Sequence, residues 1–183
     1  MILGVTGTNA SGKGVLCSIL KELHGFTILS LADILREEAS SRGIEPSTNN
    51  LIALGNEFRE KYGAAVLAKL IKKRLPDGDV VIDSIRNPVE VEELRKIPGF
   101  FFIAIDAPQK LRYEREHSRG RVGNVKSFDD WLSIEKLEDE ENPLHLQVHE
   151  CMKLADYTIV NNGNKDQLIL QTGKMLQAIK EKQ

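Results

Sequence analysis

The stretch "GVTGTNASGKGV", residues 4–15, contains the pattern G-x-x-x-x-G-K between Gly7 and Lys13. The apolar run "MILGVT" before it predicts a buried strand, and the apolar spacing of "GKGVLCSILKELHG" after it predicts a helix. A glycine-rich loop between a strand and a helix turns its backbone N–H groups inward, where they bind phosphate oxygens. Lys13 is then placed to reach the β- and γ-phosphates of a nucleotide. We therefore interpret the stretch as a phosphate-binding loop, the alternative being a plain glycine-rich turn with a surface lysine.

The position after the lysine departs from the usual pattern. Ser or Thr normally follows the lysine and holds Mg²⁺ through its hydroxyl, whereas here Gly14 and then Val15 follow. The departure bears both on the geometry of the metal that accompanies ATP and on the affinity for the nucleotide, because Val15 removes an expected phosphate contact. The loop residues that we expect to bind ATP are Gly7, Thr8, Asn9, Ala10, Ser11, Gly12, Lys13, Gly14 and Val15.

Length, composition and charge describe an ordinary globular chain. The 183 residues are 41% hydrophobic and 28% charged with a net charge of −2, which favours a single domain over residues 1–183. This charge gives no reason to expect a nucleic-acid polymer or a membrane as partner. The N-terminus does not resemble a signal peptide, and no apolar run approaches the roughly 18 residues of a membrane span. We expect a cytoplasmic protein in which Cys17 and Cys151 are reduced core residues.

Short apolar runs alternate with amphipathic stretches along the chain. The expected strands are "MILGVT", "FTILS", "DVVIDS", "GFFFIAIDA" and "DYTIVNN". The stretch "PLHLQVHECMKLA", residues 143–155, predicts a helix before the last of these strands. Strands that alternate with helices form a parallel sheet covered on both faces. We therefore predict an α/β protein with the P-loop NTPase three-layer fold, a five-stranded parallel sheet with helices on both faces.

Acidic and basic residues follow two of the expected strands. Asp83 ends the apolar run "DVVID", where a carboxylate would help to hold Mg²⁺ through water, and Arg86 follows three residues later. Asp33 follows the second strand, and Arg36 comes one helical turn after it. A guanidinium suits phosphate oxygens because it can donate two parallel hydrogen bonds. The plain alternatives are helix-capping carboxylates and surface arginines.

The segment "LRYEREHSRGRVG" carries four arginines before a glycine-containing loop. A solvated helix face is the usual meaning of such a run. The run lies where the small-molecule kinases that this chain resembles keep a lid, and lid arginines stabilise charge in a loose transition state. That resemblance implies that two of the three residues Arg115, Arg119 and Arg121 act on the transferring phosphates. The lid would span about residues 115–127.

Five segments resemble the P-loop nucleoside monophosphate kinase group, and they occur in its order along nearly the whole chain. The likeness is closest to archaeal-type adenylate kinase-like proteins, deoxynucleotide kinases and dephospho-coenzyme A kinases. In these enzymes "GKG" is usually followed by Thr, so Val15 is a departure. No segment specifies the acceptor. The segments are "GTNASGKG", "LADILREEASSRGIEP", "LGNEFREKYG", "VVIDSIRNPVEVEELRK" and "LADYTIVNNG".

The resemblance implies roles for the acidic and basic residues. Asp33 would lie near the reacting phosphoryl group, where it organises Mg²⁺ waters or accepts a proton from an acceptor hydroxyl. Arg86 occupies the position of the arginine in "DGFPR", which binds the acceptor's phosphate. A helical insert over about residues 32–75 would bind the acceptor, with Asn56 and Arg59 as candidate contacts. The full acceptor set is Asp33, Arg36, Arg59 and Arg86, and the metal set is Asp83 and Asp33.

The same resemblance places the turn after the last strand near the base of ATP. There Asn161, Asn162 and Gly163 would present backbone and amide groups to adenine, although a plain strand-to-helix turn fits these residues equally well. Asn162 and Gly163 complete the expected ATP site. The residues expected to act in catalysis are Lys13, Asp33, Arg86, Arg115, Arg119 and Arg121.

The expected function is that of an ATP-dependent small-molecule kinase. With Mg²⁺, it would transfer the γ-phosphoryl group of ATP to a phosphate-bearing, nucleotide-like acceptor, a ribo- or deoxyribonucleoside monophosphate. Two alternatives stay open. One is a dephospho-coenzyme A kinase, in which Asp33 would serve as base for a hydroxyl acceptor. The other is a regulatory or assembly ATPase that binds nucleotide without a small-molecule acceptor.

Overall fold

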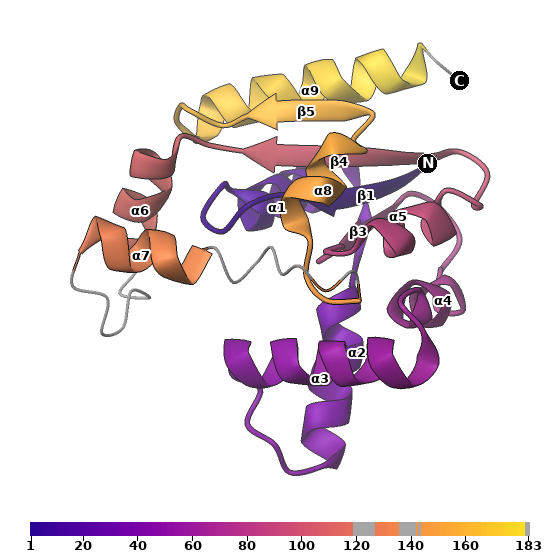
Figure 1. Cartoon of the computed structure of the whole chain (residues 1–183). Helices are drawn as coiled ribbons and strands as arrows, with labels where there is room; N and C mark the ends of the chain where they lie inside the picture. The colour runs from indigo at the N-terminus through magenta and orange to yellow at the C-terminus, as the bar shows by residue number, and fades with distance from the viewer. Residues whose placement is uncertain (119–126, 136–141, 143, 182–183) are drawn as a thin grey trace.

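A computed structural model describes residues 1–118, 127–135, 142 and 144–181. These residues form a five-stranded parallel sheet in the order β2-β3-β1-β4-β5. Figure 1 shows the helices packed on both faces of the sheet, as the sequence predicts. The strands are β1 (Ile2–Thr6), β2 (Thr27–Ser30), β3 (Val80–Asp83), β4 (Phe100–Asp106) and β5 (Tyr157–Val160).

The helices fill the intervals between the strands. The first four are α1 (Lys13–His24), α2 (Leu31–Ser41), α3 (Thr48–Tyr62) and α4 (Val66–Lys72). The others are α5 (Pro88–Leu94), α6 (Gln109–Ser118), α7 (Phe128–Glu135), α8 (Val148–Lys153) and α9 (Lys165–Lys180). Three of them, α2, α3 and α4, lie between β2 and β3, over the range predicted for an acceptor-binding insert. That role stays a prediction.

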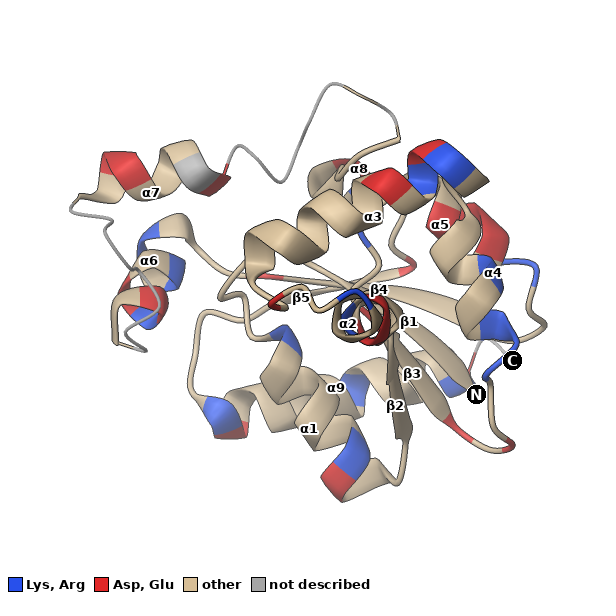
Figure 2. Ribbon diagram, turned by 90° about the horizontal axis from the view of Figure 1, so that it is seen from below, with Lys and Arg blue, Asp and Glu red and all other residues tan. Residues whose placement is uncertain are grey.

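Two apolar cores lie on opposite faces of the sheet, because successive strand residues point to opposite faces. Val81 of β3 packs with Leu16 and Leu20 of α1 and with residues of α9. Its neighbours Val80 and Ile82 pack on the other side against α2, α4 and α5. Figure 2 shows the charged residues on the helices and near the strand ends, while the strands between are largely free of them. Among the described residues, no helix is long and apolar enough to cross a membrane.

Local signals in the sequence fix several helix ends. Gly25 ends α1 with a left-handed backbone (φ 74°), which glycine adopts without steric cost. Asn87 caps α5 in a reciprocal pair with Glu90, and Pro88 occupies the first helical position. The cap at Asn87 fixes the end of the β3–α5 loop at which α5 begins.

The helix predicted over residues 143–155 is wrong at its start, since α8 covers only Val148–Lys153. The residues before it serve the β3–α5 loop instead. The N–H of Gln147 donates to the oxygen of Arg86 at 2.8 Å, and the oxygen of His145 accepts from Nδ2 of Asn87 at 2.8 Å. Backbone groups used in this way are not available to a helix, and this tertiary pairing overrides the local apolar spacing.

Glu93 of α5 forms an ion pair with α4, and the contribution of that pair to the free energy of unfolding depends on pH. Its carboxylate accepts hydrogen bonds from Lys72 at 2.8 Å and Lys96 at 2.6 Å. These bonds lower the pKa of Glu93 from 4.5 to about 2. Because the folded pKa lies below the unfolded one, this stabilisation is complete above about pH 4.5 and is lost as the pH falls towards about 2.

We predict that Glu93→Gln flattens the dependence of stability on pH in this acid range, because the neutral amide cannot gain a proton. Urea unfolding of the wild type and the variant at several values between about pH 6 and about pH 2 measures it. Identical slopes in the two proteins would contradict the assignment of this pKa to the lysine contacts.

Candidate active site

The phosphate loop joins β1 to α1 at the carboxyl ends of the strands (Figure 1). Glycine is required at two of its positions. A Cβ on Gly7 (φ 146°) would lie 1.9 Å from the backbone oxygen of Ile105, and one on Gly12 (φ 108°) would lie 2.3 Å from Nδ2 of Asn161. β4 and the turn after β5 therefore confine the loop, and only a glycine allows so close an approach.

Lys13 and Ser11 bind the loop's own backbone. Nζ of Lys13 donates to the oxygen of Gly7 and, at 2.9 Å, to the oxygen of Thr8. Oγ of Ser11 donates to the same oxygen of Thr8 at 2.7 Å. The first carbonyl groups of the loop are thus bound from inside the loop itself. This fits a loop whose N–H groups are to be presented to a ligand.

Two arginines of α6 bind the carbonyl groups that follow. Arg112 donates to the oxygen of Asn9 at 3.3 Å. Arg115 donates to the oxygens of Ala10 at 3.3 Å and Ser11 at 3.4 Å. The two arginines stand three positions apart, on one face of the helix. They bind the carbonyl groups of Asn9, Ala10 and Ser11, whereas Lys13 binds those of Gly7 and Thr8.

The turn after β5 is tied to the same loop. Nδ2 of Asn161 donates to the oxygen of Ser11 at 2.7 Å. Arg115 donates to the oxygens of Asn161 at 3.1 Å and Gly163 at 3.4 Å. The structure thus brings together the loop, Arg115 and this turn, three parts of the expected ATP site. A cavity of about 190 Å³ lies among them, lined by Gly12, Val15, Arg115, Asn161, Gly163, Asn164, Lys165 and Leu168.

Asn162 and Gly14 stand apart from these contacts. Asn162 is not among the residues that line this cavity. A Cβ on Gly14 would meet no described atom within 4 Å. Unlike at Gly7 and Gly12, steric crowding does not require glycine at position 14. The missing hydroxyl is therefore not explained by lack of space.

Asp83 is the last residue of β3, and β3 is a direct neighbour of β1, the strand that the phosphate loop follows. Its Oδ1 is buried and accepts no hydrogen bond from the described residues. A buried carboxylate oxygen without a donor fits a metal-bound water, which would supply the donor. Burial, and then the charge of Asp83, raise the pKa of the neighbouring Cys17 thiol to about 12. That thiol is neutral near pH 7 and leaves the carboxylate as the local negative charge.

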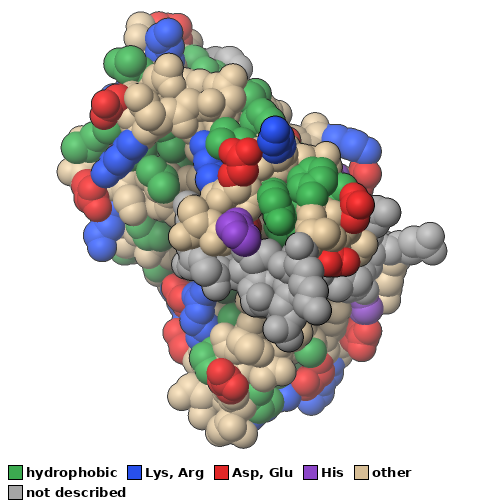
Figure 3. All heavy atoms as spheres, turned by 90° about the vertical axis from the view of Figure 1, so that its left-hand side faces the viewer, with side chains coloured by type: hydrophobic (Ala, Val, Ile, Leu, Met, Phe, Trp, Pro, Cys, Tyr) green, Lys and Arg blue, Asp and Glu red, His purple; other side chains and the backbone are tan. Residues whose placement is uncertain are grey.

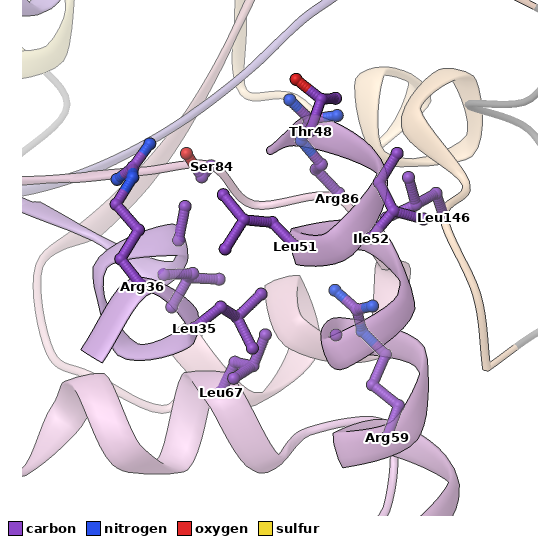
Figure 4. A pocket seen from close by; sticks show the side chains of 13 residues that line it. Leu35, Arg36, Thr48, Leu51, Ile52, Arg59, Leu67, Ser84, Arg86 and Leu146 are labelled. Carbon is purple, nitrogen blue, oxygen red and sulfur yellow. The ribbon is translucent and has the colours of Figure 1, made fainter. Parts of the chain in front are cut away.

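A second cavity of about 160 Å³ opens between α2, α3 and the β3–α5 loop. Figure 4 shows leucine and isoleucine side chains along its walls, with Arg36 and Arg86 reaching it from α2 and from the loop. Both arginines belong to the predicted acceptor set, and the structure brings them to one cavity. Its lining residues are Leu31, Ala32, Leu35, Arg36, Thr48, Leu51, Ile52, Gly55, Arg59, Leu67, Ser84, Arg86 and Leu146.

Asp33 does not line this cavity. Its carboxylate pairs with Arg36 at 2.5 Å, and the two side chains are 56% and 52% exposed. A pair this exposed is weak and can exchange partners. Arg36 can therefore leave Asp33 for a stronger anion, and the structure leaves the predicted roles of Asp33 in metal binding and proton transfer as predictions.

Arg59 touches the cavity but is committed to another partner. Its guanidinium, 3% exposed, donates to Oε1 of the fully buried Glu90 at 2.9 and 3.1 Å. The other oxygen of Glu90 accepts from the backbone N–H groups of Arg86 and Asn87 at 3.0 and 3.2 Å. Arg59 thus fixes the loop that carries Arg86. Its predicted direct contact with the acceptor stays a prediction.

Several residues that build the site escaped sequence reasoning. Arg112 looked like part of a solvated helix face, yet it is buried and donates to Glu135 of α7 at 2.8 Å. Its guanidinium also lies over the ring of Trp131, 5.1 Å from the centroid. Glu90 was visible as a capping-box glutamate, three residues after Asn87, but its buried pairing was not. Arg119 and Arg121, and most of the predicted lid, lie outside the described residues.

The surface at this end of the molecule is mixed in character. Figure 3, which faces the left-hand side of Figure 1, shows basic, acidic and hydrophobic side chains interspersed on the described surface. Proteins that bind nucleic-acid polymers typically carry a continuous basic strip. On the described part of this face, the basic side chains do not form such a strip.

Comparisons with solved structures identify the fold. TT1252 from Thermus thermophilus superposes with a TM-score of 0.64 at 20% identity, over 97% of this chain and 96% of that one. Shikimate kinase from Bacteroides thetaiotaomicron superposes with a TM-score of 0.63 at 14% identity, over 99% of this chain and 98% of that one. A gluconokinase from Sinorhizobium meliloti superposes with a TM-score of 0.54 at 18% identity, over 93% of this chain and 87% of that one. At these identities the likeness shows the P-loop kinase fold alone.

Comparisons of sequence identify the family. Residues 6–134 match a family model described as an AAA domain. The UPF0200 protein of Aeropyrum pernix is 37% identical over 170 residues, 92% of this chain and 88% of that protein. A UPF0200 protein of Pyrococcus abyssi is 36% identical over 172 residues, 90% of this chain and 89% of that protein. The narrower resemblance to nucleoside monophosphate kinases stays a prediction. The chain has the P-loop kinase fold, matches the AAA domain family and belongs to the UPF0200 family.

Proposed function

We propose that the protein is an ATP-dependent kinase that transfers the γ-phosphoryl group to a ribo- or deoxyribonucleoside monophosphate. ATP binds the Gly7–Lys13 loop, with its base in the cavity beside Asn161 and Gly163. The acceptor occupies the cavity at Arg36 and Arg86. The fold supports this arrangement, because β1 and β3 are neighbours and their carboxyl ends carry the two binding loops side by side.

The observation that carries the proposal is the chemistry of the acceptor cavity. Its described walls are mainly leucine and isoleucine, with two hydroxyls from Thr48 and Ser84 and three arginines. No carboxylate or carboxamide side chain is among these lining residues. A polyol needs acceptors for its several O–H donors, and among these lining side chains only the hydroxyls of Thr48 and Ser84 can accept. A flat, weakly polar base attached to a phosphate fits the apolar walls and the arginines together.

Catalysis then consists mainly of positioning and charge stabilisation. An oxygen of the acceptor's phosphate bonds to the γ-phosphorus while the bond from the γ-phosphorus to the β–γ bridging oxygen breaks, and ADP leaves. Lys13 turns from its carbonyl partners to the β- and γ-phosphates. Asp83, with Asp33 as the predicted second carboxylate, would hold Mg²⁺ through water, and the metal would neutralise phosphate charge. Arg86 orients the acceptor, and two of the three residues Arg115, Arg119 and Arg121 remain the predicted groups that act on the transferring phosphoryl group.

A dephospho-coenzyme A kinase is the second candidate within the same site. Its acceptor is a hydroxyl and needs a base, the role that the sequence assigned to Asp33. The exposed pair of Asp33 with Arg36 leaves that carboxylate accessible. A regulatory or assembly ATPase would use the nucleotide cavity alone, and the built acceptor cavity argues against it.

We predict that the wild-type protein, given Mg-ATP and a panel of acceptors, forms ADP together with a nucleoside diphosphate. The panel contains the common ribo- and deoxyribonucleoside monophosphates, dephospho-coenzyme A, shikimate and gluconate, and chromatography separates the products. Phosphorylated dephospho-coenzyme A would favour the second candidate. ADP with free phosphate only, or no turnover despite ATP binding, would overturn both and favour the ATPase.

We predict that Arg36→Ala and Arg86→Ala each lower kcat/KM for the acceptor by roughly 10- to 100-fold, the value of a charge-assisted hydrogen bond. Both should keep the wild-type affinity for ATP, measured by calorimetry. Arg74→Ala is the matched control, because Arg74 forms an exposed pair with Glu37 at 2.7 Å and does not line either cavity. Wild-type transfer by both variants would show that the acceptor binds elsewhere.

We predict that Arg115→Met weakens ATP binding by roughly 10-fold or more, since the loop and the turn after β5 lose their shared donor. Calorimetric titration with a non-hydrolysable ATP analogue measures the change. Far-UV circular dichroism and the melting temperature report whether the fold is retained. An unchanged affinity in a folded variant would show that Arg115 does not shape the nucleotide site.

A further inference from the structure

Ser84 has a backbone conformation that its side chain disfavours. Its φ is 65°, in the left-handed region, and Ala10 is its single non-glycine companion in positive φ among the described residues. Glycine adopts this conformation without steric cost, whereas a residue with a Cβ is strained there. Such strain concentrates at functional sites, where the surroundings enforce it.

The surroundings of Ser84 do enforce it. Oγ1 of Thr6, at the end of β1, donates to the oxygen of Ile85 at 2.8 Å. The N–H of Gln147 donates to the oxygen of Arg86 at 2.8 Å. Glu90 accepts the N–H of Arg86 at 3.0 Å. Three separate parts of the chain thus fix the loop directly after Ser84, and the loop cannot relax around it.

The hydroxyl of Ser84 lies where the two halves of the site meet. It accepts from Oγ of Ser30 at 3.0 Å and makes a long contact, 3.4 Å, as donor to Oδ2 of Asp83. Ser84 also lines the acceptor cavity, and in Figure 4 it lies between Arg36 and Arg86. A donor with so long a bond to its present acceptor is ready to take a better one.

We infer that Ser84 is an acceptor-binding residue whose hydroxyl donates to the phosphate of the acceptor, beside the oxygen that attacks ATP. The inference rests on the proposed function and adds a contact that fixes the acceptor between Arg86 and the carboxylate of Asp83. Ser30 supports it, because Ser30 donates to the Ser84 hydroxyl and so leaves Ser84 as the donor, either to Asp83 or to a ligand in the cavity. A glycine at position 84 would relieve the backbone strain, but it would lack the hydroxyl that this role requires.

The inference predicts opposite effects of one substitution on stability and on transfer. Ser84→Gly removes the strain and the hydroxyl together, and we expect its melting temperature to rise by about 2–4 °C. We expect its KM for the acceptor to rise about 10-fold or more, with an unchanged affinity for the ATP analogue. Ser84→Ala is the matched variant, because it keeps the strained Cβ and loses only the hydroxyl.

The experiment measures melting temperature, analogue affinity and acceptor kinetics for the wild type and both variants, with the nucleoside monophosphate that the wild type uses best. Support requires a stability gain in Ser84→Gly alone and a similar transfer defect in both variants. Wild-type KM in folded Ser84→Ala overturns the inference and leaves the proposed function intact. No stability gain in Ser84→Gly overturns the argument from strain. A wild-type protein that phosphorylates no member of the panel overturns the proposed function, and this inference with it.

Discussion

The phosphate loop can offer its N–H groups to a ligand only if its carbonyl groups find partners elsewhere. Every carbonyl from Gly7 to Ser11 has one, and the donors come from inside the loop, from α6 and from the turn after β5. An unpaired buried carbonyl costs free energy comparable to a lost hydrogen bond. The positions of α6 and β5 relative to β1 are therefore tied to the shape of the loop.

The buried carboxylate of Glu90 likewise needs hydrogen-bond partners, and these partners fix the residues around the proposed acceptor cavity. One carboxylate oxygen binds Arg59 of α3, and the other holds the backbone that carries Arg86. A buried ion pair of this kind is expensive to desolvate and adds little net stability, but it is costly to break. Its effect is to fix where α3 lies over the β3–α5 loop. The cavity between them therefore has a definite shape.

The sequence predicted the sheet, the phosphate loop and the gathering of Arg36 and Arg86, because strand runs, glycine spacing and loop positions after strands are local signals. It could not predict that Arg59 pairs with Glu90 or that Arg112 is buried with Glu135, because both pairings join residues distant in the chain. The same limit explains why the helix predicted over residues 143–155 begins too early. The apolar spacing before Val148 favours a helix, but the backbone groups of His145 and Gln147 bind the β3–α5 loop instead.

Cys17 lies one turn into the helix that follows the phosphate loop, a place where a thiol often becomes reactive. Helix N-termini and nearby cations usually stabilise the thiolate. Here burial and the charge of Asp83 outweigh Lys13 and raise the thiol pKa to about 12, so the thiolate fraction near neutrality is on the order of 10⁻⁵. Peroxide and alkylating reagents act on thiolates. Cys17 should therefore react with such reagents far more slowly at neutral pH than an exposed thiol with the ordinary pKa does.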